Sequence, residues 1–463
     1  MSFYKEMDQE ELLSVAKEWE ALIAAHRYAD FRVQVSRYHI TEIGEIFANI
    51  SDEYEGRAFR LLTKEQAAEL FLTFDSERME RIISLVSDAE LAKMLDEMYL
   101  DDTVDIIEEM PAYIVKKIMR NSTREDREAL SRLLRYPADS AGTIMTTEYL
   151  RFRPEQTVEE ALRHIRRVAI DKETIYTGYI TDKERRLLGI VTAKKLLISD
   201  PETPLADIME THVISVSTAE DKEAVALKFD KHGFLALPVV DAENRLVGIV
   251  TVDDAMDVLR EEVEEDIAKM AGMSPSETPY LKTRISTLFL ARVPWLLLLM
   301  ISATFSSTIL GVFESALPAV LVLFVPMLMD TGGNSGGQSS VTLIRGLSLG
   351  EVTPRDVGKV VFKEVRVGLL CGLAVGAAAF GKVMLVDRLI MQNPSVTLQV
   401  ALAVAIAMLL TVLLAKLIGC LLPLGAVRLG FDPAVMASPF ITTIVDALAL
   451  LMYFVISKNI LLL

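Results

Sequence analysis

Two polar segments interrupt the apolar C-terminal part of the chain, and both could handle a cation. The first is Leu429-Gly430-Phe431-Asp432-Pro433-Ala434. A carboxylate near a lipid bilayer is costly unless water or a cation accompanies it, so Asp432 is a candidate cation ligand. Gly430 permits backbone geometry that directs carbonyl oxygens at the same point. The alternative is structural, with Asp432 capping a helix at the membrane interface and Pro433 in its first turn.

The second polar segment is DTGGNSGGQSS at residues 330–340. Its four glycines are expected to break a helix at membrane depth, which is tolerated only against protein or a water-filled cavity. Asn334 and Gln338 would then line a pore, together with Gly430 of the first segment. The alternative is close packing of helices through small side chains. A nucleotide cradle is excluded, because no Gly-Lys-Ser/Thr follows and no strand precedes the segment.

A third group of polar residues is the acidic stretch at residues 253–272, which is expected to form one long helix ending at Gly272. Spacings of three and four residues place several carboxylates on a common face, where like charges repel. The acidic members are Asp254, Asp257, Glu261, Glu262, Glu264, Glu265 and Asp266. A divalent cation bridging them to another acidic surface would remove the repulsion and favour a compact state. A solvated charged face is the simpler alternative.

The composition shows what surrounds these segments. The 463 residues include 48 basic and 65 acidic residues, yet 51% are hydrophobic. Residues 281–463 hold 13 basic and 8 acidic residues, so residues 1–280 carry a net charge of −22. An acidic soluble part therefore precedes an apolar membrane part. This acidity argues against nucleic acid as a partner and suits divalent cations. No nucleophile, Cys/His or Walker constellation indicates an enzyme.

The apolar part is expected to contain five membrane spans, since about 20 residues cross a bilayer. They are residues 293–310, 317–329 extended into the glycine-rich segment, 367–386, 396–422 and 434–457. The loop between the second and third spans is basic and should be cytoplasmic. Its basic residues are Arg345, Arg355, Lys359, Lys363 and Arg366. The N-terminus is then cytoplasmic and the C-terminus external, in the cytoplasmic membrane.

The soluble part divides into two kinds of sequence. Residues 8–140 read as short amphipathic helices in a superhelical stack, with cap-type residues before each. The expected caps are Ser51, Thr63, Ser76, Ser87, Asp101 and Thr123. Residues 143–260 alternate strand-like and helical runs and contain a repeat, with LLGIVT at 187–192 and LVGIVT at 246–251. This repeat resembles a tandem pair of CBS domains.

CBS pairs often bind adenine nucleotides, with a Thr at the end of the GIVT strand and an Asp three residues later. The second copy keeps this pattern in Thr251 and Asp254, whereas Lys195 follows Thr192 in the first. The resemblance therefore implies one candidate ATP site, in which Asp254 would serve two roles.

The whole order of parts resembles the MgtE family of magnesium channels, with TGGNSGGQS and FDPA…SPF…TT as signature-like segments. The resemblance covers nearly the whole chain. It implies a multi-domain membrane protein with an all-α superhelical N-domain, an α/β tandem CBS pair, a long connecting helix and a five-helix transmembrane domain. The expected boundaries are 1–140, 141–202, 203–260, 253–280 and 281–463. The implied protein is a homodimer in the lipid bilayer that conducts Mg²⁺ and closes when cytosolic Mg²⁺ is high.

The resemblance also assigns roles to residues. Asp432 matches the family's pore aspartate and Asn334 a pore-facing asparagine, while Asp101 or Asp102 is the N-domain partner of the sensor. The sensor residues fall on Asp254, Asp257, Glu262, Glu265 and Asp266. Asp446, fourteen residues after Asp432, is expected to be a packing or second-site residue.

Other functions fit parts of the pattern. They are a CBS-regulated transporter of Co²⁺ or Mn²⁺, a chloride transporter-like or magnesium-efflux module, and a sensor that transports nothing. A single five-span block and an Asp-Pro start of the last span argue against the chloride transporter-like or magnesium-efflux module. Five spans with an intramembrane Asp are more than the anchor of a sensor needs.

Overall fold

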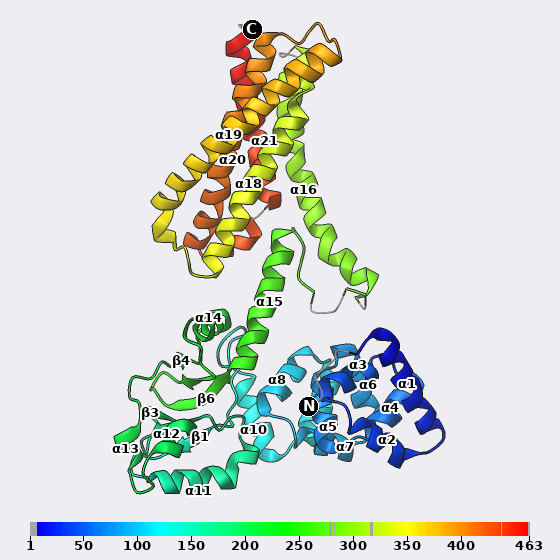
Figure 1. Cartoon of the computed structure of the whole chain (residues 1–463), viewed down its shortest axis with the longest axis vertical. Coiled ribbons are helices and arrows are strands. Elements are labelled where there is room, and N and C mark those ends of the chain that lie inside the picture. The colour runs from blue at the N-terminus through cyan, green and yellow to red at the C-terminus, as the bar shows by residue number, and fades with distance from the viewer. Residues whose placement is uncertain (1–6, 277–279, 282, 315–317, 437, 462–463) are drawn as a thin grey trace. The chain divides into compact units, whose positions relative to one another are not determined.

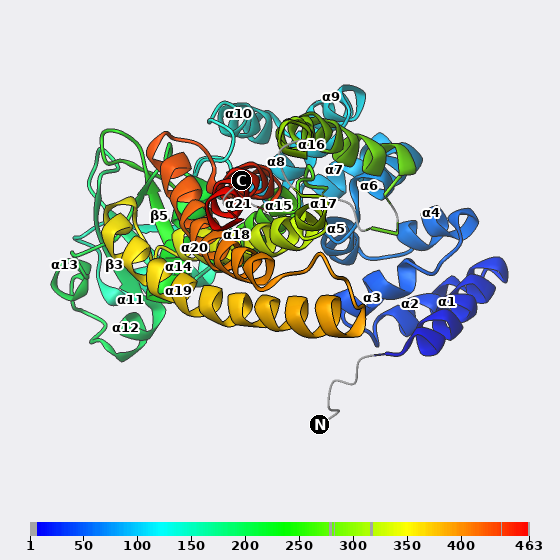
Figure 2. The same cartoon turned by 90° about the horizontal axis from the view of Figure 1, so that it is seen from above.

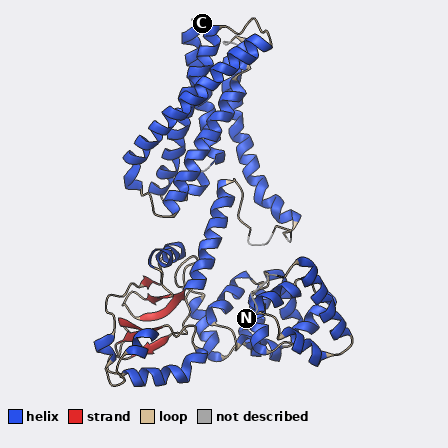
Figure 3. Ribbon diagram, viewed as in Figure 1, coloured by secondary structure: helices blue, strands red, loops and turns tan. Residues whose placement is uncertain are grey.

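The structure is a computed structural model that describes residues 7–276, 280–281, 283–314, 318–436 and 438–461. The chain forms two compact units, Met1–Leu259 and Arg260–Leu463. The strands lie in one part of the first unit, and helices form nearly all the rest of the described chain (Figure 3). This agrees with the predicted class, an all-helical N-domain, an α/β pair and a helical membrane part.

The N-domain consists of short helices around one apolar core (Figure 1). The helices are α1 (Gln9–Ala24), α2 (Tyr28–Val35), α3 (Ile40–Phe47), α4 (Asp52–Arg60), α5 (Lys64–Leu72), α6 (Ser76–Leu85), α7 (Asp88–Leu95), α8 (Leu100–Glu109), α9 (Ala112–Asn121) and α10 (Arg124–Leu133). Trp19 is fully buried and packs edge-on against Phe31, Tyr38 and Phe47, with ring centroids 5.4, 5.9 and 6.0 Å away. Aromatic pairs of this kind stabilise a core beyond their buried area.

Of the six predicted helix caps, three are confirmed with their hydrogen bonds, Ser51 precedes α4 without a side-chain cap bond, and two are displaced. Thr63, Ser87 and Thr123 accept a hydrogen bond from a backbone N–H of the following turn, as an N-cap should. Asp75, not Ser76, caps α6, and Tyr99 precedes α8 where Asp101 was expected to do so. Asp101 therefore lies in the first turn of α8, where its side chain is 7% exposed.

The tandem repeat folds as two small sheets with the same topology. The first repeat contains β1 (Leu150–Phe152), α11 (Val158–Val168), η1 (Ala169–Asp171), β2 (Thr177–Thr181), β3 (Leu187–Thr192), α12 (Ala193–Ile198) and α13 (Leu205–Ile208). The second contains β4 (Val216–Ser217), α14 (Lys222–His232), β5 (Ala236–Val240) and β6 (Leu246–Thr251). In each, a parallel pair is followed by an antiparallel pair, in the orders β1-β2-β3 and β4-β5-β6.

The two repeats hold each other through reciprocal backbone pairing. Thr146 exchanges both hydrogen bonds with Ile249, at 2.8 and 2.9 Å, and Glu210 does the same with Ile190, both at 2.9 Å. The glycine of each GIVT strand permits this approach, because a Cβ at Gly248 would lie 2.7 Å from the Thr146 carbonyl oxygen. The repeated sequence thus encodes a paired structure and not two independent domains.

The second unit is a bundle of long helices. Its elements are α16 (Ile285–Glu314), α17 (Ala319–Val322), α18 (Val325–Ser348), η2 (Pro354–Asp356), α19 (Val357–Lys382), η3 (Val383–Ile390), α20 (Leu398–Arg428), η4 (Pro433–Met436) and α21 (Ser438–Leu461). The connecting helix α15 (Val252–Met270) runs from the last residues of the first unit into the second. It ends at Met270, and Gly272, two residues further on, has a φ of 67°, in the left-handed region that favours glycine.

In the described part of the chain, four of these helices are long and apolar enough to cross a membrane. They cover Ile285–Val312, Pro354–Ile390, Leu398–Arg428 and Pro433–Leu461. The fifth expected span corresponds to α18, which is less apolar and packs against α20 and α21 (Figure 2). Because its neighbours cover it, α18 can carry small and polar residues that a lipid-exposed helix could not.

The expectation that the glycine-rich segment breaks a helix is wrong. Residues 330–340 lie within the continuous helix α18. The glycines instead allow close contact, as in the packing alternative: a Cβ at Gly336 would lie 2.6 Å from Ile441 Cγ2, and one at Gly419 would lie 2.2 Å from the Gly336 carbonyl oxygen. An α-helix pairs its own backbone N–H and C=O groups by hydrogen bonds, as the interior of a membrane requires. The closely packed neighbouring helices stabilise this helix despite its glycines.

A polar link inside the bundle fixes α18 between α19 and α20. Ser339 Oγ donates a hydrogen bond to Glu364 Oε2 at 2.7 Å, and Lys416 Nζ donates to Ser339 Oγ at 3.3 Å. Lys416 is only 5% exposed. A buried charge that is paired in this way restrains the rotation of α18 and therefore sets which of its faces points outward.

Candidate functional site

The first candidate site is a group of carboxylates between the N-domain and the first CBS repeat, within the first unit. Asp101 and Asp102 lie in the first turn of α8, and Asp254 lies in the first turn of α15. Glu148 precedes β1 and Glu173 follows η1, and the Glu173 N–H donates to the Glu148 carbonyl oxygen at 3.0 Å. Buried oxygens of Asp101, Glu148 and Glu173 have no hydrogen-bond partner among the described residues.

The electrostatics of these residues show mutual repulsion. Burial, together with the negative charges of Asp254 and Asp102, raises the pKa of Asp101 well above its ordinary value. Burial and the charge of Asp254 raise the pKa of Glu173 to about 8. Burial likewise raises the pKa of Glu148 to about 7. In each case burial, which removes water from the carboxylate, is the largest cause of the shift, and at Glu148 the charge of Lys172 opposes it.

The two aspartates that face each other on α8 and α15 show the same effect. Burial raises the pKa of Asp102 to about 6, and it raises the pKa of Asp254 to about 6 even though Thr251 donates a hydrogen bond to Asp254. In the described chain, no three carboxylates, histidines or cysteines converge closely enough to hold a bare metal ion. Carboxylate oxygens are among the ligands that Mg²⁺ takes, and Mg²⁺ usually keeps several of its waters when it binds.

The second candidate site surrounds Asp432, within the second unit. Asp432 follows Gly430, whose φ is 78°, and Asp432 Oδ1 accepts a hydrogen bond from the Ala434 N–H at 2.8 Å. The residue thus caps η4, whereas Pro433 was expected to begin the last long helix, which starts only at Ser438. Asp432 Oδ1 therefore has the capping role of the structural alternative, and Asp432 Oδ2 is available to a cation.

That second oxygen is held by a lysine of the connecting helix. Lys269 Nζ lies 2.6 Å from Asp432 Oδ2 and 2.5 Å from Glu265 Oε1. Although burial acts to lower it, the hydrogen bonds to Asp432 and Glu265 raise the pKa of Lys269 above its ordinary value. The ammonium group therefore stays charged and occupies the place that a cation bound to Asp432 would take.

Further contacts attach the end of α15 to the same region. Asp266 Oδ2 accepts a hydrogen bond from Ser348 Oγ at 3.1 Å, and Met270 packs against Ile344 and Ala434. Burial and the charge of Asp432 raise the pKa of Asp266, although the Ser348 bond lowers it. The end of α15 thus contacts both the last residue of α18 and the loop that carries Asp432.

The structure places the predicted pore residues of α18 on one exposed stripe. Asn334 and Gln338 are both exposed and one turn apart, opposite the buried glycines. Asp330 and Thr342 extend the stripe by one turn in each direction and are also exposed. A row of polar side chains on a helix of a membrane bundle requires water or another protein surface beside it.

The remaining predicted residues have mixed outcomes. Glu265 and Asp266 take part in the contacts at Asp432, and Asp254 belongs to the carboxylate group of the first unit. Asp257 and Glu262 also lie on α15. Thr251 is 5% exposed and its hydroxyl donates to Asp254 at 2.5 Å, which is the pair expected to hold a ribose.

Comparison with known proteins covers all three parts of the chain. The family described as "Divalent cation transporter", MgtE, matches residues 325–456. The MgtE intracellular N domain matches residues 38–139, and the CBS domain matches residues 141–201 and 205–261. The magnesium transporter MgtE of Thermus thermophilus is 37% identical over 435 residues, which cover 92% of this chain and 94% of that protein. The chain belongs to the MgtE family.

Other MgtE relatives agree with this assignment. The magnesium transporter MgtE of Bacillus subtilis is 30% identical and covers 94% of both chains. Among solved structures, the soluble part of a magnesium transporter is 31% identical, with a TM-score of 0.51, and matches 55% of this chain and 99% of that one. The cytosolic domain of the Mg²⁺ channel MgtE in complex with ATP is 34% identical, with a TM-score of 0.50 over 52% of this chain and 99% of that one.

Sequence reasoning missed Lys269, Glu148 and Glu173. Lys269 is one of two basic residues, with Arg260, in a helix rich in acidic residues, and that contrast was a usable signal. Glu148 lies two residues after the first repeat motif, Ile144-Met145-Thr146, which contains the residue that pairs with the other repeat. Glu173 carries no comparable sequence signal, because its role depends on the packing of α8 against the first repeat.

Proposed function

We propose that the chain forms a magnesium-selective channel of the cytoplasmic membrane that closes when cytosolic Mg²⁺ is high. The observation that carries the proposal is the ion pair between Lys269 and Asp432. It joins the helix that contains the acidic sensor to the carboxylate that the sequence assigns to the pore. The protein uses Mg²⁺ as its cargo and no chemical step is required, so binding, exclusion and release are its whole mechanism.

The closed state is explained by competition between two cations for Asp432. A hydrated Mg²⁺ entering the loop meets an ammonium group that is covalently tethered and therefore always present. Only movement of α15 away from Asp432 frees the carboxylate. Conduction then needs a site that binds weakly enough to release the ion, which one carboxylate per chain with surrounding carbonyl oxygens supports.

The sensing step is assigned to the carboxylates of the first unit. Without a divalent ion, Asp101, Asp102 and Asp254 repel one another and oppose the contact of α8 with α15. Hydrated Mg²⁺ bound among them, with Glu148 and Glu173, removes this repulsion and favours the compact arrangement. Asp254 and Lys269 lie fifteen residues apart on one helix, roughly 22 Å at 1.5 Å per residue, so α15 connects the sensor to the pore loop.

We further propose that two copies complete the pore. Each chain supplies one Asp432, and its polar stripe at Asp330, Asn334, Gln338 and Thr342 is exposed. Two chains facing each other through this stripe would bury it around water and cations.

In a chain whose Cys371 and Cys420 are replaced by alanine, Asn334→Cys should form a disulfide between copies. Leu370→Cys, at a 70% exposed apolar position on α19, is the matched control and should not. Crosslinking at Leu370 alone would contradict this interface.

The proposed topology has the N-terminus in the cytoplasm and the C-terminus outside, with domain boundaries near residues 140, 202, 260 and 280. The charged loop of Arg355 and Lys359 supports a cytoplasmic position for the α18–α19 connection. Accessibility of introduced cysteines to an impermeant thiol reagent, before and after opening the vesicles, tests this orientation.

A nucleotide site is proposed at the second CBS repeat. The related cytosolic domain was solved in complex with ATP. Here Thr251 and Asp254 present a hydroxyl and a carboxylate that could hold the two hydroxyls of a ribose. Asp254 also belongs to the carboxylate group, so ATP binding and Mg²⁺ binding should be coupled. Calorimetric titration of ATP into the full chain, at low and high Mg²⁺, tests this: equal affinity in both contradicts the coupling.

Ion flux into liposomes is the direct test of the channel itself. Mg²⁺, Co²⁺ and Mn²⁺ should each be offered to the reconstituted chain, with Mg²⁺ varied on the side of the soluble part. We expect Mg²⁺ flux that falls as this Mg²⁺ rises. A correctly inserted protein that carries no divalent cation would contradict the proposal and favour a sensor without transport, and preferential Co²⁺ or Mn²⁺ flux would favour the alternative cargo.

A further inference from the structure

One end of α19 carries exposed basic residues on a single face of the helix. Lys359, Lys363 and Arg366 follow one another at spacings of four and three residues, which places them on the same face. All three residues are exposed, and Arg355, in the short helix η2 that precedes α19, is exposed as well. We call Lys359, Lys363 and Arg366 the basic stripe.

The packing of α19 shows which way the basic stripe points. Gly368, Gly372 and Gly376 of the same helix are buried. A Cβ at Gly372 would lie 2.7 Å from the Leu409 carbonyl oxygen of α20, so the glycine face fits closely against that helix. Gly372 lies nine residues after Lys363, which is about two and a half turns at 3.6 residues per turn. The basic stripe therefore lies on the face of α19 opposite to α20.

Apolar side chains continue the same face of α19 into the membrane span. Leu370 and Leu373 follow Arg366 at spacings of four and three residues and are 70% and 53% exposed. The segment Pro354–Ile390 is long and apolar enough to cross a membrane, and the expected span begins at residue 367. The basic stripe thus ends where the span begins, and exposed leucines follow it. A phospholipid has the same two parts in the same order, a charged headgroup and apolar chains.

Two members of the basic stripe have no carboxylate partner among the described residues. Lys359 Nζ pairs with Asp356 Oδ1 at 2.7 Å, whereas no described carboxylate pairs with Lys363 or Arg366. The Arg366 guanidinium lies 4.3 Å from the centre of the Phe362 ring, and its Nε donates to the Phe362 carbonyl oxygen at 3.3 Å. These contacts hold the guanidinium in place and leave its two terminal nitrogens for another acceptor. A guanidinium presented in this way suits a phosphate group.

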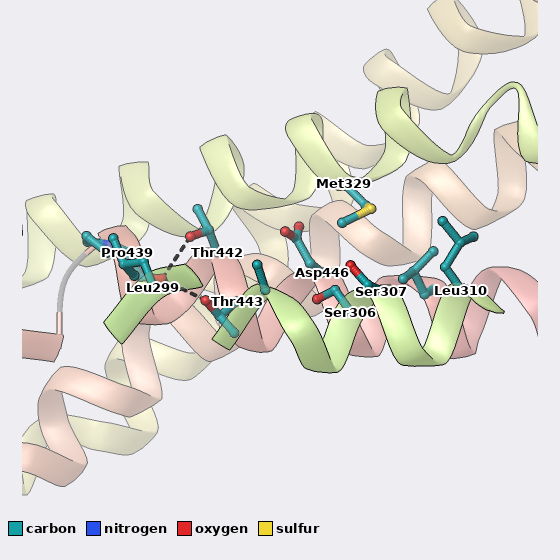
Figure 4. Close-up of a pocket in the computed structure, with 11 residues that line it drawn as sticks. Leu299, Ser306, Ser307, Leu310, Met329, Pro439, Thr442, Thr443 and Asp446 are labelled. Atoms are coloured by element: carbon teal, nitrogen blue, oxygen red, sulfur yellow. Dashed lines mark hydrogen bonds between the residues drawn. The ribbon is translucent and has the colours of Figure 1, made fainter. Parts of the chain in front are cut away.

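The nearby carboxylates are mostly engaged elsewhere. Glu364 follows Lys363 in the sequence but accepts a hydrogen bond from Ser339 Oγ of α18 at 2.7 Å. Asp446 lines a cavity of about 350 Å³ whose lining residues come from α16, α18 and α21 and not from α19 (Figure 4). Glu351, in the connection between α18 and η2, is exposed. The basic residues without a carboxylate partner therefore outnumber Glu351, and the local field attracts an anion.

We propose that the basic stripe, together with Leu370 and Leu373, binds an anionic phospholipid. The lysines and the arginine hold the negatively charged headgroup, and the leucines contact an acyl chain. The inference does not depend on which ion the protein carries or on whether it conducts. Under the proposed topology the bound lipid belongs to the cytoplasmic leaflet, whose surface potential is negative.

Two alternatives account for less of this arrangement. The preference for basic residues on the cytoplasmic side requires charge near this end of α19, but it does not require charges that share one face with exposed leucines. A second copy of the chain is a poorer occupant, because two basic stripes facing each other would bring like charges together. A phospholipid supplies both the opposite charge and the apolar surface.

Native mass spectrometry of the full chain in detergent tests the proposal. Phosphatidylglycerol, which has a net negative charge, and phosphatidylcholine, which has a phosphate but no net charge, are titrated separately. We expect saturable binding of phosphatidylglycerol that is at least about tenfold tighter than that of phosphatidylcholine. Lys363→Gln combined with Arg366→Gln should weaken phosphatidylglycerol binding about tenfold, because two basic contacts are lost. If this double variant does not fold, Lys363→Gln alone should weaken the binding a few-fold.

Two further variants serve as controls. Lys363→Arg combined with Arg366→Lys keeps both charges and should keep the preference for phosphatidylglycerol. Arg388→Gln combined with Lys458→Gln removes two exposed charges from η3, which follows the other end of α19, and from the last turns of α21. This matched control should leave the affinity for phosphatidylglycerol unchanged.

Four results would overturn the lipid site. Equal affinity for the two lipids would show that charge does not select the ligand, and unchanged binding in the Lys363 and Arg366 glutamine variants would place the lipid elsewhere. Full displacement of phosphatidylglycerol by excess glycerol 3-phosphate would indicate a site for a free phosphate compound. A change in the number of chains per particle in the double glutamine variant would show that a second copy covers this face. Because lipid binding is read without ion transport, failure of the channel proposal leaves all of these results interpretable.

Discussion

The carboxylates of the first unit and Asp432 of the second unit differ in whether a positively charged side chain pairs with them. Asp101 is buried, and Glu148 and Glu173 are half-buried. Each has one buried oxygen without a hydrogen-bond partner among the described residues, and the pKa of each is raised. Asp432 instead pairs with the ammonium group of Lys269, at 2.6 Å.

Under the proposed function, the first group senses Mg²⁺ and the second is the blocked site. A site that lacks a counter-ion gains free energy when Mg²⁺ binds, and so it responds to Mg²⁺ concentration. A site whose counter-ion is attached to a movable helix responds to the position of that helix. In the proposed scheme, α15 carries Asp254 near its start and Lys269 near its end, so that Mg²⁺ binding in the first region would favour the ion pair in the second. Four sets of substitutions and one change of pH test this scheme.

The largest effect is expected from removing the pore carboxylate. Asp432→Ala should reduce Mg²⁺ flux roughly a hundredfold or more, because the permeating cation loses its proposed carboxylate partner, which costs about 2–5 kcal/mol. The loss should exceed that of Asp446→Ala, because Asp446 is expected to be a packing or second-site residue. Flux into liposomes containing equal amounts of inserted protein is the measurement. Equal flux in the unchanged chain and in Asp432→Ala would remove Asp432 from the ion path.

The next effect concerns the tethered cation. Lys269→Met should make the channel harder to close and raise flux at high cytosolic-side Mg²⁺ by about fivefold, the lower end of typical coupling energies of 1–3 kcal/mol. We use the lower end of this range because the Lys269–Asp432 ion pair is partly exposed, so that water and salt screen it. Lys269→Arg keeps the charge and is the matched control. A reduced flux in Lys269→Met would show that the lysine supports conduction and does not block it.

The sensor itself should give a smaller change that appears as a loss of response. Asp101→Asn combined with Glu173→Gln removes two unpaired carboxylates, so the repulsion and the Mg²⁺ ligands are lost together. The dependence of flux on Mg²⁺ should flatten, and Mg²⁺ should no longer protect the soluble part from protease. Glu108→Gln, at an exposed position on the same helix α8, should behave as the unchanged chain. An intact Mg²⁺ response in the double variant would place the sensor elsewhere.

The α15 carboxylates provide a related variant. Changing Asp254, Asp257, Glu262 and Asp266 together to amides should also flatten the response to Mg²⁺. The resting state of this variant depends on the balance between lost repulsion and lost ligands, so the response and not the resting flux is the measurement. A response equal to that of the unchanged chain would contradict a sensor on α15.

The smallest effect is on pH. The folded pKa of Glu173 is about 8 and that of Glu148 about 7, both above their ordinary values, so protonation stabilises the Mg²⁺-free soluble part at low pH. This contribution is lost as pH rises from about 6 to 8, and Mg²⁺ should restore it because it replaces the protons. Thermal unfolding at pH 6 and 8, with and without Mg²⁺, measures this. A Mg²⁺ stabilisation that is larger at pH 6 than at pH 8 would contradict the assignment.

Local patterns in the sequence identified the parts of this chain well. The GIVT repeat predicted the paired sheets, and the apolar runs predicted the long helices of the second unit. The cap positions failed by one or two residues at Ser76 and Asp101, since several polar residues occur together there and only the chain geometry selects one. The glycine-rich segment was misread because glycine lowers helix propensity, while tight packing of α18 against α20 and α21 outweighs that preference.

By itself, the sequence determined that an acidic soluble part precedes a membrane bundle, and that Asp432 is a polar residue in an apolar setting. Only the tertiary structure decided which carboxylates are unpaired, that Lys269 contacts a residue 163 positions away, and that Asn334 and Gln338 face outward from an intact helix. The physical reason is that composition and periodicity are local, whereas burial and charge pairing depend on which distant segments pack together. The function of a carboxylate depends on the residues around it, and the tertiary fold determines which residues these are.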